Sequence, residues 1–174
     1  AKMNSLCDRE IIACLYEASC AGVKIELVVR GICCLKAGVP GLSENITVHS
    51  IVGNFLEHAR IFYFENGGSP EVYMGSADWM PRNLDKRVEI MFPVEDPALK
   101  EQVIHILKVQ LADNVKAHIL QPDGTYEKID KRGKVLVTAQ EQFCEEAVAM
   151  AKAATARDDV HNTRVFVPSE GQGL

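Results

Sequence analysis

An amphipathic helix that leads directly into an apolar strand is the feature that most constrains the fold of this chain. Residues 8–22 (DREIIACLYEASCAG) place apolar side chains at helical spacing, with Asp8 positioned to cap the first turn and Gly22 the last. Residues 24–35 (KIELVVRGICCL) are apolar and β-branched, which predicts a buried strand. A helix followed at once by such a strand predicts an α/β domain built on a mixed sheet.

The segments that follow continue this alternation of helices and strands. Their predicted structures are an ordered loop at 36–48, a short helix at 49–58, a hairpin of strands 59–64 and 72–79 around a turn at 65–71, and a strand at 86–94. The later elements are a helix at 97–113 with Asp96 as its N-cap, a hairpin at 118–129 and an amphipathic helix at 138–157. We therefore expect one α/β domain over residues 1–157 and a polar tail over residues 158–174.

Composition bounds the class of protein. The 174 residues are 47% hydrophobic and 25% charged, as in an ordinary globular domain, and no apolar run reaches the length of a membrane span. The net charge of −5 gives no general case for nucleic-acid binding. Six cysteines without a CxxC pair predict reduced, buried thiols in a cytoplasmic protein, with peripheral membrane association left open. The first residues, AKMNSL, resemble a strand rather than a signal peptide, so we expect a longer chain upstream.

Basic side chains stand at corresponding places on three predicted strands. Arg30 ends the first strand, where open α/β sheets contact their ligands. His58 and Arg60 share a face of the strand around 58–64, with Phe62 and Phe64; Arg87 and Glu89 share a face of the strand at 86–94, opposite Val88, Ile90 and Phe92. Arginine binds phosphate oxygens in a fork, and histidine can donate or shuttle a proton near neutral pH. This pattern predicts a site for phosphoryl groups.

Structural explanations exist for the same residues. A strand histidine is more often a packed core residue than a ligand-binding one, and Arg30 could cap its strand and extend to water. Arg87 and Glu89 could form only a surface ion pair, which contributes little. The turn ENGG is not a phosphate-binding P-loop, because it has neither the lysine nor the following helix. The remaining histidines, His49, His105, His118 and His161, show no ligand spacing.

The stretch HARIFYFE followed by GSAD resembles the phospholipase D superfamily signature, H-x-K-x4-D with a later G-S-x-N. Arg60 stands in the lysine position, Glu65 in the aspartate position and Asp78 in the asparagine position. These departures count against a working phosphodiesterase. The resemblance implies a phospholipase D-like mixed sheet flanked by helices, with a C-terminal helix.

A longer resemblance covers residues 1–117 and is carried by AKMNSL, VVRGICCL, GLSENITVHSIVGNFLEHARIFYFENGG and VYMGSADWMPRNLDKRVEIMFPVEDP. These stretches are similar to the C-terminal part of the bacterial, long-chain-synthesising polyphosphate kinases. The resemblance implies a reversible transfer of the terminal phosphate of ATP to polyphosphate, through a phosphohistidine in an upstream domain that these residues lack.

The same resemblance implies roles for individual residues. Arg30 and His58 would contact nucleotide phosphates, with His58 catalytic, and Arg87 and Glu89 would line the same tunnel. It further implies ATP or ADP and polyphosphate as ligands, Mg²⁺ held by groups outside this segment, upstream domains of the same polypeptide, and a homo-oligomeric full-length enzyme. The isolated segment should be inactive. A phospholipase D-type half-site and a non-catalytic polyphosphate- or nucleotide-binding module are the alternatives.

Overall fold

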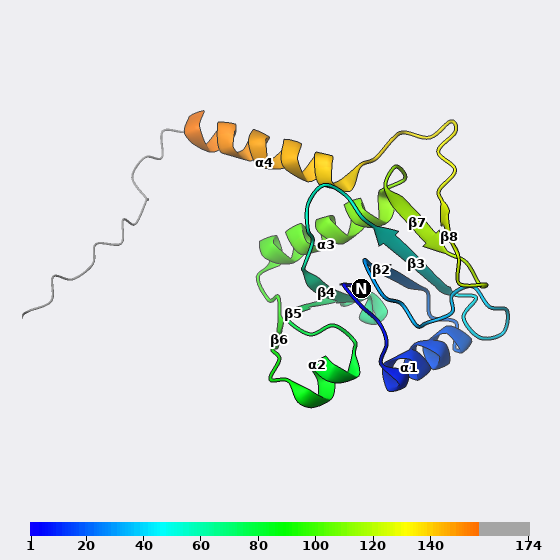
Figure 1. The fold of residues 1–174 in the computed structure, drawn as a ribbon. Helices are drawn as coiled ribbons and strands as arrows, with labels where there is room; N and C mark the ends of the chain where they lie inside the picture. The colour runs from blue at the N-terminus through cyan, green and yellow to red at the C-terminus, as the bar shows by residue number, and fades with distance from the viewer. Residues whose placement is uncertain (157–174) are drawn as a thin grey trace, which may run out of the picture. The chain divides into compact units, whose positions relative to one another are not determined.

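The computed structural model describes residues 1–156 and contains one eight-stranded mixed sheet, in the order β6-β5-β4-β1-β2-β3-β7-β8 (Figure 1). The strands are β1 (Lys2–Met3), β2 (Ile25–Val29), β3 (Ile46–Ile51), β4 (Arg60–Phe64), β5 (Glu71–Gly75), β6 (Met91–Pro93), β7 (Ala117–Leu120) and β8 (Tyr126–Lys128). The helices are α1 (Arg9–Cys20), α2 (Pro81–Lys86), α3 (Pro97–Ala112), α4 (Ala139–Ala156) and a 3₁₀ turn, η1 (Asn66–Gly68). The predicted α/β class, a mixed sheet flanked by helices with a C-terminal helix, is confirmed.

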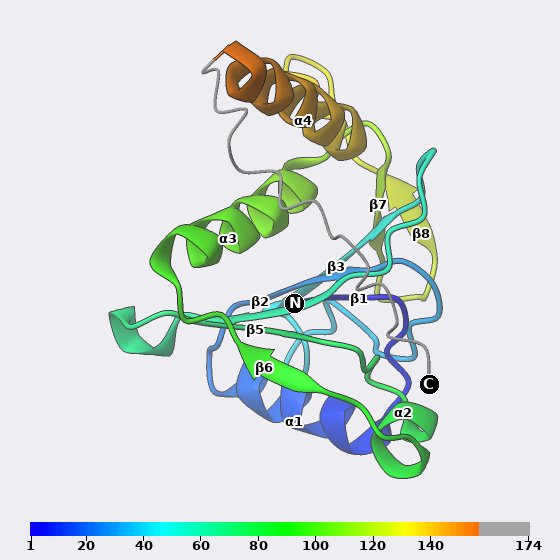
Figure 2. The same cartoon turned by 90° about the vertical axis from the view of Figure 1, so that its left-hand side faces the viewer.

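Helices α1 and α3 cover opposite faces of the sheet, as Figure 2 shows. On one face Leu27, Val48 and Phe62 form a buried cluster against which residues of α1 pack. On the other face Ile61 and Val72 pack with Val103 and Leu107 of α3. Neighbouring residues of β4 enter different clusters because successive strand side chains point to opposite faces. Residues 1–140 form one compact unit, and a second unit, starting at Glu141, contains most of α4.

Local signals located several elements correctly. Asp8 caps α1 by accepting from the Ile11 amide at 2.9 Å, and Asp96 caps α3 by accepting from the Leu99 amide at 2.9 Å. Helix α1 ends one residue earlier than predicted, at an Ala21 cap, and Gly22 follows with φ +88. The β4–β5 and β7–β8 hairpins and α4 are also confirmed. The predicted tail at 158–174 and His161 lie outside the described residues.

The helix predicted at residues 49–58 is wrong. Residues Ile46–Ile51 instead form β3, which pairs in parallel with β2 from Ile25↔Ile46 to Val28↔His49 and antiparallel with β7. The β-branched side chains of this segment favour a strand once neighbours are available, and the shortness of the apolar run left helix and strand indistinguishable by spacing. The segment from 52 to 59 is irregular.

The strand predicted at residues 86–94 is mostly wrong as well. Helix α2, with Pro81 in its first turn, occupies the chain up to Lys86, and only Met91–Pro93 pair with β5. The expected apolar face is not buried: Val88 is fully exposed, and Ile90 and Phe92 are largely exposed. The alternation of this segment therefore does not reflect a buried sheet face.

The cysteines are free thiols, but the prediction that they are buried is wrong. Four of them are exposed and two are half-buried: exposed are Cys14, Cys20, Cys34 and Cys144, and half-buried are Cys7 and Cys33. Cys14 and Cys20 belong to α1, and their positions do not face the core cluster that this helix covers. Among residues 1–156 no helix is both long and apolar enough to cross a membrane.

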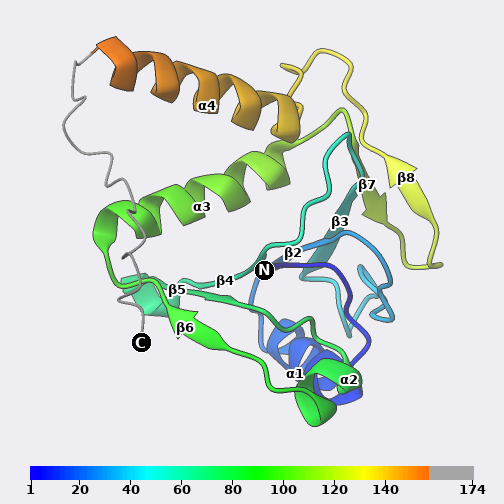
Figure 3. The same ribbon diagram turned by 60° about the vertical axis from the view of Figure 1, so that its left-hand side comes forward.

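The centre of the sheet contains a gap beside β1. Lys2 pairs with Val28 on one side and Ile61 on the other, whereas β2 and β4 continue for three further residues past these positions, to Ile25 and Phe64. A mostly apolar cavity of about 1010 Å³ lies at this gap. Figure 3 shows the N-terminus between β2 and β4.

Candidate anion-binding site

Four strand ends meet at one edge of the sheet. Asn4 follows β1 and Arg30 follows β2, and these two strands run parallel. Arg60 begins β4, which runs antiparallel to β1, and Asp78 follows β5, the hairpin partner of β4. Open α/β sheets present ligand-binding side chains at strand ends of this kind. The 1010 Å³ cavity lies elsewhere, at the gap beside Ala1.

A buried ion pair forms the centre of this edge. The guanidinium of Arg60 donates from Nε to Oδ1 of Asp78 and from Nη2 to Oδ2, both at 3.1 Å. The two side chains are only 10% and 9% exposed. Burial would raise the pKa of Asp78, but hydrogen bonds from Arg60 and from the amides of Asn4 and Ser5 outweigh it and lower that pKa. Asp78 is therefore held as a carboxylate that fixes the orientation of Arg60.

Asn4 connects the ion pair to Arg30. Its amide N–H donates to Oδ1 of Asp78 at 2.8 Å, and its own Oδ1 accepts from Nε of Arg30 at 3.1 Å. The backbone of Arg30 is fixed too, since its N–H donates to Met3 and its carbonyl accepts from Ser50. Neither Nη of Arg30 has a partner within residues 1–156. The fork of N–H groups that suits a phosphate is thus held in a fixed orientation, with both Nη groups available to an anion.

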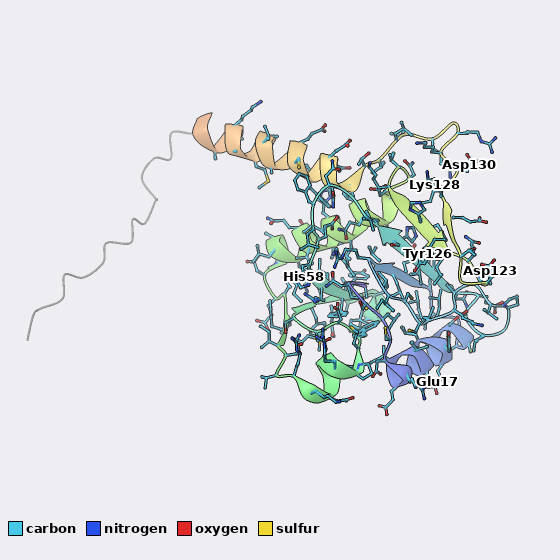
Figure 4. All side chains as sticks on the ribbon, in the orientation of Figure 1. Glu17, His58, Asp123, Tyr126, Lys128 and Asp130 are labelled. Carbon is cyan, nitrogen blue, oxygen red and sulfur yellow. The ribbon has the colours of Figure 1, made fainter. Side chains whose placement is uncertain are left out.

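His58 lies at the surface just before β4, outside the strand in which it was predicted. Figure 4 labels it, well apart from Tyr126 and Lys128 of β8. Nη1 of Arg60 lies 2.8 Å from the His58 carbonyl oxygen and 3.0 Å from its Nδ1. Nη2 of Arg60 also lies 3.4 Å from Nε2 of His58, so both ring nitrogens face the guanidinium, which can only donate. The exposure of His58 excludes the core-residue explanation.

The irregular segment before β4 is held in place by hydrogen bonds to the side chains of Gln140 and Gln110. The side chain of Gln140 accepts from the Phe55 amide at 3.0 Å and donates to the Phe55 carbonyl at 2.8 Å. Glu57 accepts from Gln140 and from Gln110 of α3. These contacts fix the residues on the N-terminal side of His58, while Arg60 fixes the imidazole itself.

Glu89 is held by polar side chains rather than by its predicted partner. Ser76 and Asn83 both donate to its carboxylate, and these hydrogen bonds are the main reason its pKa is lowered. Nη1 of Arg87 lies 4.0 Å from the carboxylate, at the limit of an ion pair, and the Arg87 side chain is 55% exposed. Arg60 also acts on Glu89 through its charge. Arg87 and Glu89 therefore belong to the same edge, with Arg87 extended toward solvent.

Gly75, the first residue of the GSAD stretch, lies where a larger residue does not fit. A Cβ at this position would lie 2.7 Å from the carbonyl oxygen of Ile90. Ser76 continues the contact, exchanging hydrogen bonds of 3.0 Å with the backbone of Ile90 while its hydroxyl holds Glu89. The motif thus docks the chain around Glu89 against β5.

We expect Gly75→Ala to lower the free energy of unfolding by about 1–3 kcal/mol, the usual cost of overpacking, because the backbone of Ile90 must move. Gly31→Ala is the graded comparison, since its Cβ would meet the Asn4 carbonyl at the milder distance of 3.1 Å. Urea denaturation of both variants measures the difference. A loss for Gly75→Ala no greater than that for Gly31→Ala would contradict this account of the motif.

Sequence reasoning missed Lys2, Asn4 and the role of Asp78. Lys2 is 3% exposed, donates to the Ala59 carbonyl at 3.3 Å, and lies 3.7 Å from Glu57. Burial lowers its pKa, and the charges of Arg30 and Arg60 lower it further, so Lys2 belongs to the same basic group. A polar Lys-x-Asn alternation inside an otherwise strand-like AKMNSL was the available signal.

Comparisons with known proteins agree with these observations. Residues 1–140 match the family model described as polyphosphate kinase C-terminal domain 2. The chain is 53% identical to a polyphosphate kinase of Lactiplantibacillus plantarum over 96% of this chain and 23% of that protein. It is 59% identical to polyphosphate kinase 1 of Chlorobaculum tepidum over 82% of this chain and 20% of that protein.

A solved structure gives the same result. The crystal structure of polyphosphate kinase from Porphyromonas gingivalis superposes with a TM-score of 0.83 and 43% identity, over 87% of this chain and 23% of that one. The chain thus spans about a fifth to a quarter of the length of these relatives. The resemblance inferred from the motifs is confirmed, and the chain belongs to the polyphosphate kinase C-terminal domain 2 family.

Proposed function

We propose that this chain is the C-terminal part of an ATP–polyphosphate phosphotransferase and that its Arg30–His58 edge binds the phosphates of ATP and polyphosphate. The observation that carries the proposal is that the two Nη groups of Arg30 have no partner among residues 1–156 and are oriented through Asn4 by the buried Arg60–Asp78 pair. The imidazole of His58 lies beside this pair, against the guanidinium of Arg60. Phosphoryl transfer depends chiefly on positioning and charge stabilisation, which such donors supply.

Each residue has a defined part in this proposal. Arg30 binds phosphate oxygens through its fork, and Arg87 adds a second exposed cation at the same edge. His58 orients the transferring phosphoryl group, or protonates it, and Arg60 positions His58. Glu89, held by Ser76 and Asn83, sets the position of the segment that carries Arg87.

The phosphohistidine and the metal are expected elsewhere in a longer, cytoplasmic and homo-oligomeric enzyme. Residues 1–156 contain no group of three or more His, Cys, Asp or Glu side chains that could hold a metal ion. Asp78 and Glu89 are already satisfied by Arg60 and by Ser76 with Asn83. We therefore place the Mg²⁺ ligands outside this segment, and no step of the proposal passes through the metal.

The geometry weakens the phosphodiesterase alternative. In that signature a lysine would be available to neutralise phosphate, but Arg60 in the corresponding position is bound on both sides by Asp78 and His58. A binding module without turnover uses the same donors, so kinetic measurements are needed to distinguish it from the kinase.

Inorganic tripolyphosphate should bind the 174-residue chain weakly, and the affinity should fall with salt because the attraction is largely Coulombic. Arg30→Ala should weaken binding at least ~10-fold, since hydrogen bonds to charged groups contribute about 1.5–3 kcal/mol. Arg132→Ala is the matched control, because Arg132 is an exposed arginine paired with Asp130. Titration calorimetry at low salt measures all three proteins. Equal affinity for the wild type and Arg30→Ala would remove Arg30 from the site.

We further propose that the polypeptide preceding this segment in the longer enzyme extends β1 into the gap between β2 and β4. Ala1 already continues the pairing with β2, and the ends of β2 and β4 beyond it, with the apolar cavity between them, support an additional length of strand. Adding an N-terminal extension of alternating valine and threonine should raise the melting temperature by several degrees, at about 2–4 °C per kcal/mol. A proline-rich extension of equal length cannot donate to the sheet and should have no such effect. Equal melting temperatures for the two extended chains would contradict the strand assignment.

A further inference from the structure

The segments that follow β1 and β2 run side by side beyond the ends of those strands. Leu6 and Cys33 form an isolated parallel bridge. Its two hydrogen bonds run from the Leu6 amide to the Ile32 carbonyl at 2.9 Å and from the Cys34 amide to the Leu6 carbonyl at 2.8 Å. This register places Cys7 opposite Cys34, one residue further along each segment.

Side-chain alternation brings the two thiols to the same side. Leu6 is fully buried, and Cys33 packs against the same core cluster, so both point inward. Cys7 and Cys34 therefore both point away from that cluster. Adjacent strands lie ~4.8 Å apart, which is within the ~4.4–6.8 Å between Cα atoms that a disulfide spans.

The surroundings of the two thiols differ. Cys34 is exposed, whereas Cys7 is half-buried. Burial, and to a lesser extent a hydrogen bond with the Cys34 thiol, raises the pKa of Cys7 to about 11. Cys34 is thus the accessible, attacking thiol, and Cys7 is the resolving thiol beside it. Cys33 is a poor partner for either, because its sulfur faces the core and lies 3.9 Å from the Leu35 carbonyl.

From this geometry we infer that Cys7 and Cys34 form a redox-sensitive dithiol that closes to a disulfide beside the Arg30 segment. The oxidant is a small-molecule disulfide. The thiolate of Cys34 attacks one of its sulfurs, forming a mixed disulfide and releasing the first small thiol. Cys7 then loses its proton to water, and its thiolate attacks the Cys34 sulfur, which releases the second thiol. The protein loses two electrons and two protons, and the oxidant gains them.

The disulfide would join two segments that already touch beside the anion site. The Gly31 amide donates to the Asn4 carbonyl at 2.8 Å, so the linked segments include the residue that orients Arg30. Closing the loop between residues 7 and 34 restricts the unfolded chain, and the oxidised protein should melt roughly 5–10 °C higher than the reduced protein. This inference does not depend on the proposed phosphate chemistry.

Non-reducing peptide mapping tests the inference on the whole 174-residue chain after equilibration with oxidised glutathione. Trypsin releases Cys7 in peptide 3–9 (MNSLCDR) and Cys34 in peptide 31–36 (GICCLK). We expect these two peptides to be joined in a species that dithiothreitol separates. Cys33→Ser should retain the joined species, and Cys7→Ser and Cys34→Ser should lose it.

Four results would overturn the assignment: glutathione adducts at Cys34 without the joined peptides, a bond within peptide 31–36, persistence of the joined species in Cys34→Ser, or its loss in Cys33→Ser. The wild-type map decides the first two without any substitution. Circular dichroism of the serine variants confirms that their maps come from folded protein.

Discussion

Replacing Asp78 with alanine should lower the free energy of unfolding by about 3–5 kcal/mol, because it leaves the guanidinium of Arg60 buried without its counter-charge. The loss includes the hydrogen bonds that Asp78 accepts from Asn4. Urea denaturation followed by circular dichroism gives the difference. Asp78→Ala should also weaken tripolyphosphate binding, because Asp78 orients Asn4 and Asn4 in turn orients the guanidinium of Arg30.

Asp130→Ala is the matched control for this change. Asp130 pairs with Arg132 at 2.8 Å, but the two side chains are 61% and 90% exposed. An exposed pair contributes little to stability, so this variant should be nearly as stable as the wild type. The double variant Arg60→Met, Asp78→Leu should lose less stability than Asp78→Ala, because it removes both buried charges. Similar small losses for Asp78→Ala and Asp130→Ala would show that the ion pair is not buried in solution.

Elements with local signals could be predicted from the sequence, and elements that depend on distant pairing could not. Asp8 and Asp96 cap helices three residues ahead, and the β4–β5 hairpin joins neighbouring segments. Strand β3 falls across the predicted loop at 36–48 and the predicted helix at 49–58, because its partners, β2 and β7, are separate in the sequence. Helix α2 is six residues long, too short for its period to be recognised.

The residues of the candidate site divide in the same way into those that the sequence predicts and those that only the fold brings together. Arg30 and His58 were selected by position on a strand and by resemblance, and the fold brings both to one edge through Arg60, Asp78 and Asn4. The contact between Asn4 and Asp78 joins residues 74 positions apart, and spacing rules carry no information at that range. Lys2 was missed for a similar reason, since its neighbours Arg30 and Arg60 approach it only in the folded sheet. The roles of Arg30, His58, Arg87 and Glu89 stay predictions.

His58 offers the most direct comparison between a structural and a catalytic role. Its side chain is exposed, so His58→Ala should leave the fold intact and lower stability only by the contact with Arg60. If the imidazole acts on the phosphoryl group, phosphate transfer should fall by ~10²-fold or more, the usual effect of a positioned acid–base group. His58→Gln retains a hydrogen-bond donor but cannot exchange a proton, so its rate should lie between those of the other two proteins.

The measurement is ATP-dependent polyphosphate synthesis by a chimera in which this chain replaces the matching segment of the Lactiplantibacillus plantarum polyphosphate kinase, to which it is 53% identical. The chimera with His58 sets the reference rate, and the isolated 174-residue chain should form no polymer. His105→Ala provides a control histidine, exposed on α3. The account predicts a folded His58→Ala chimera with at least ~10²-fold slower synthesis and an unimpaired His105→Ala chimera. Near-normal synthesis by a folded His58→Ala chimera would contradict the claim that this edge of the sheet acts on phosphate.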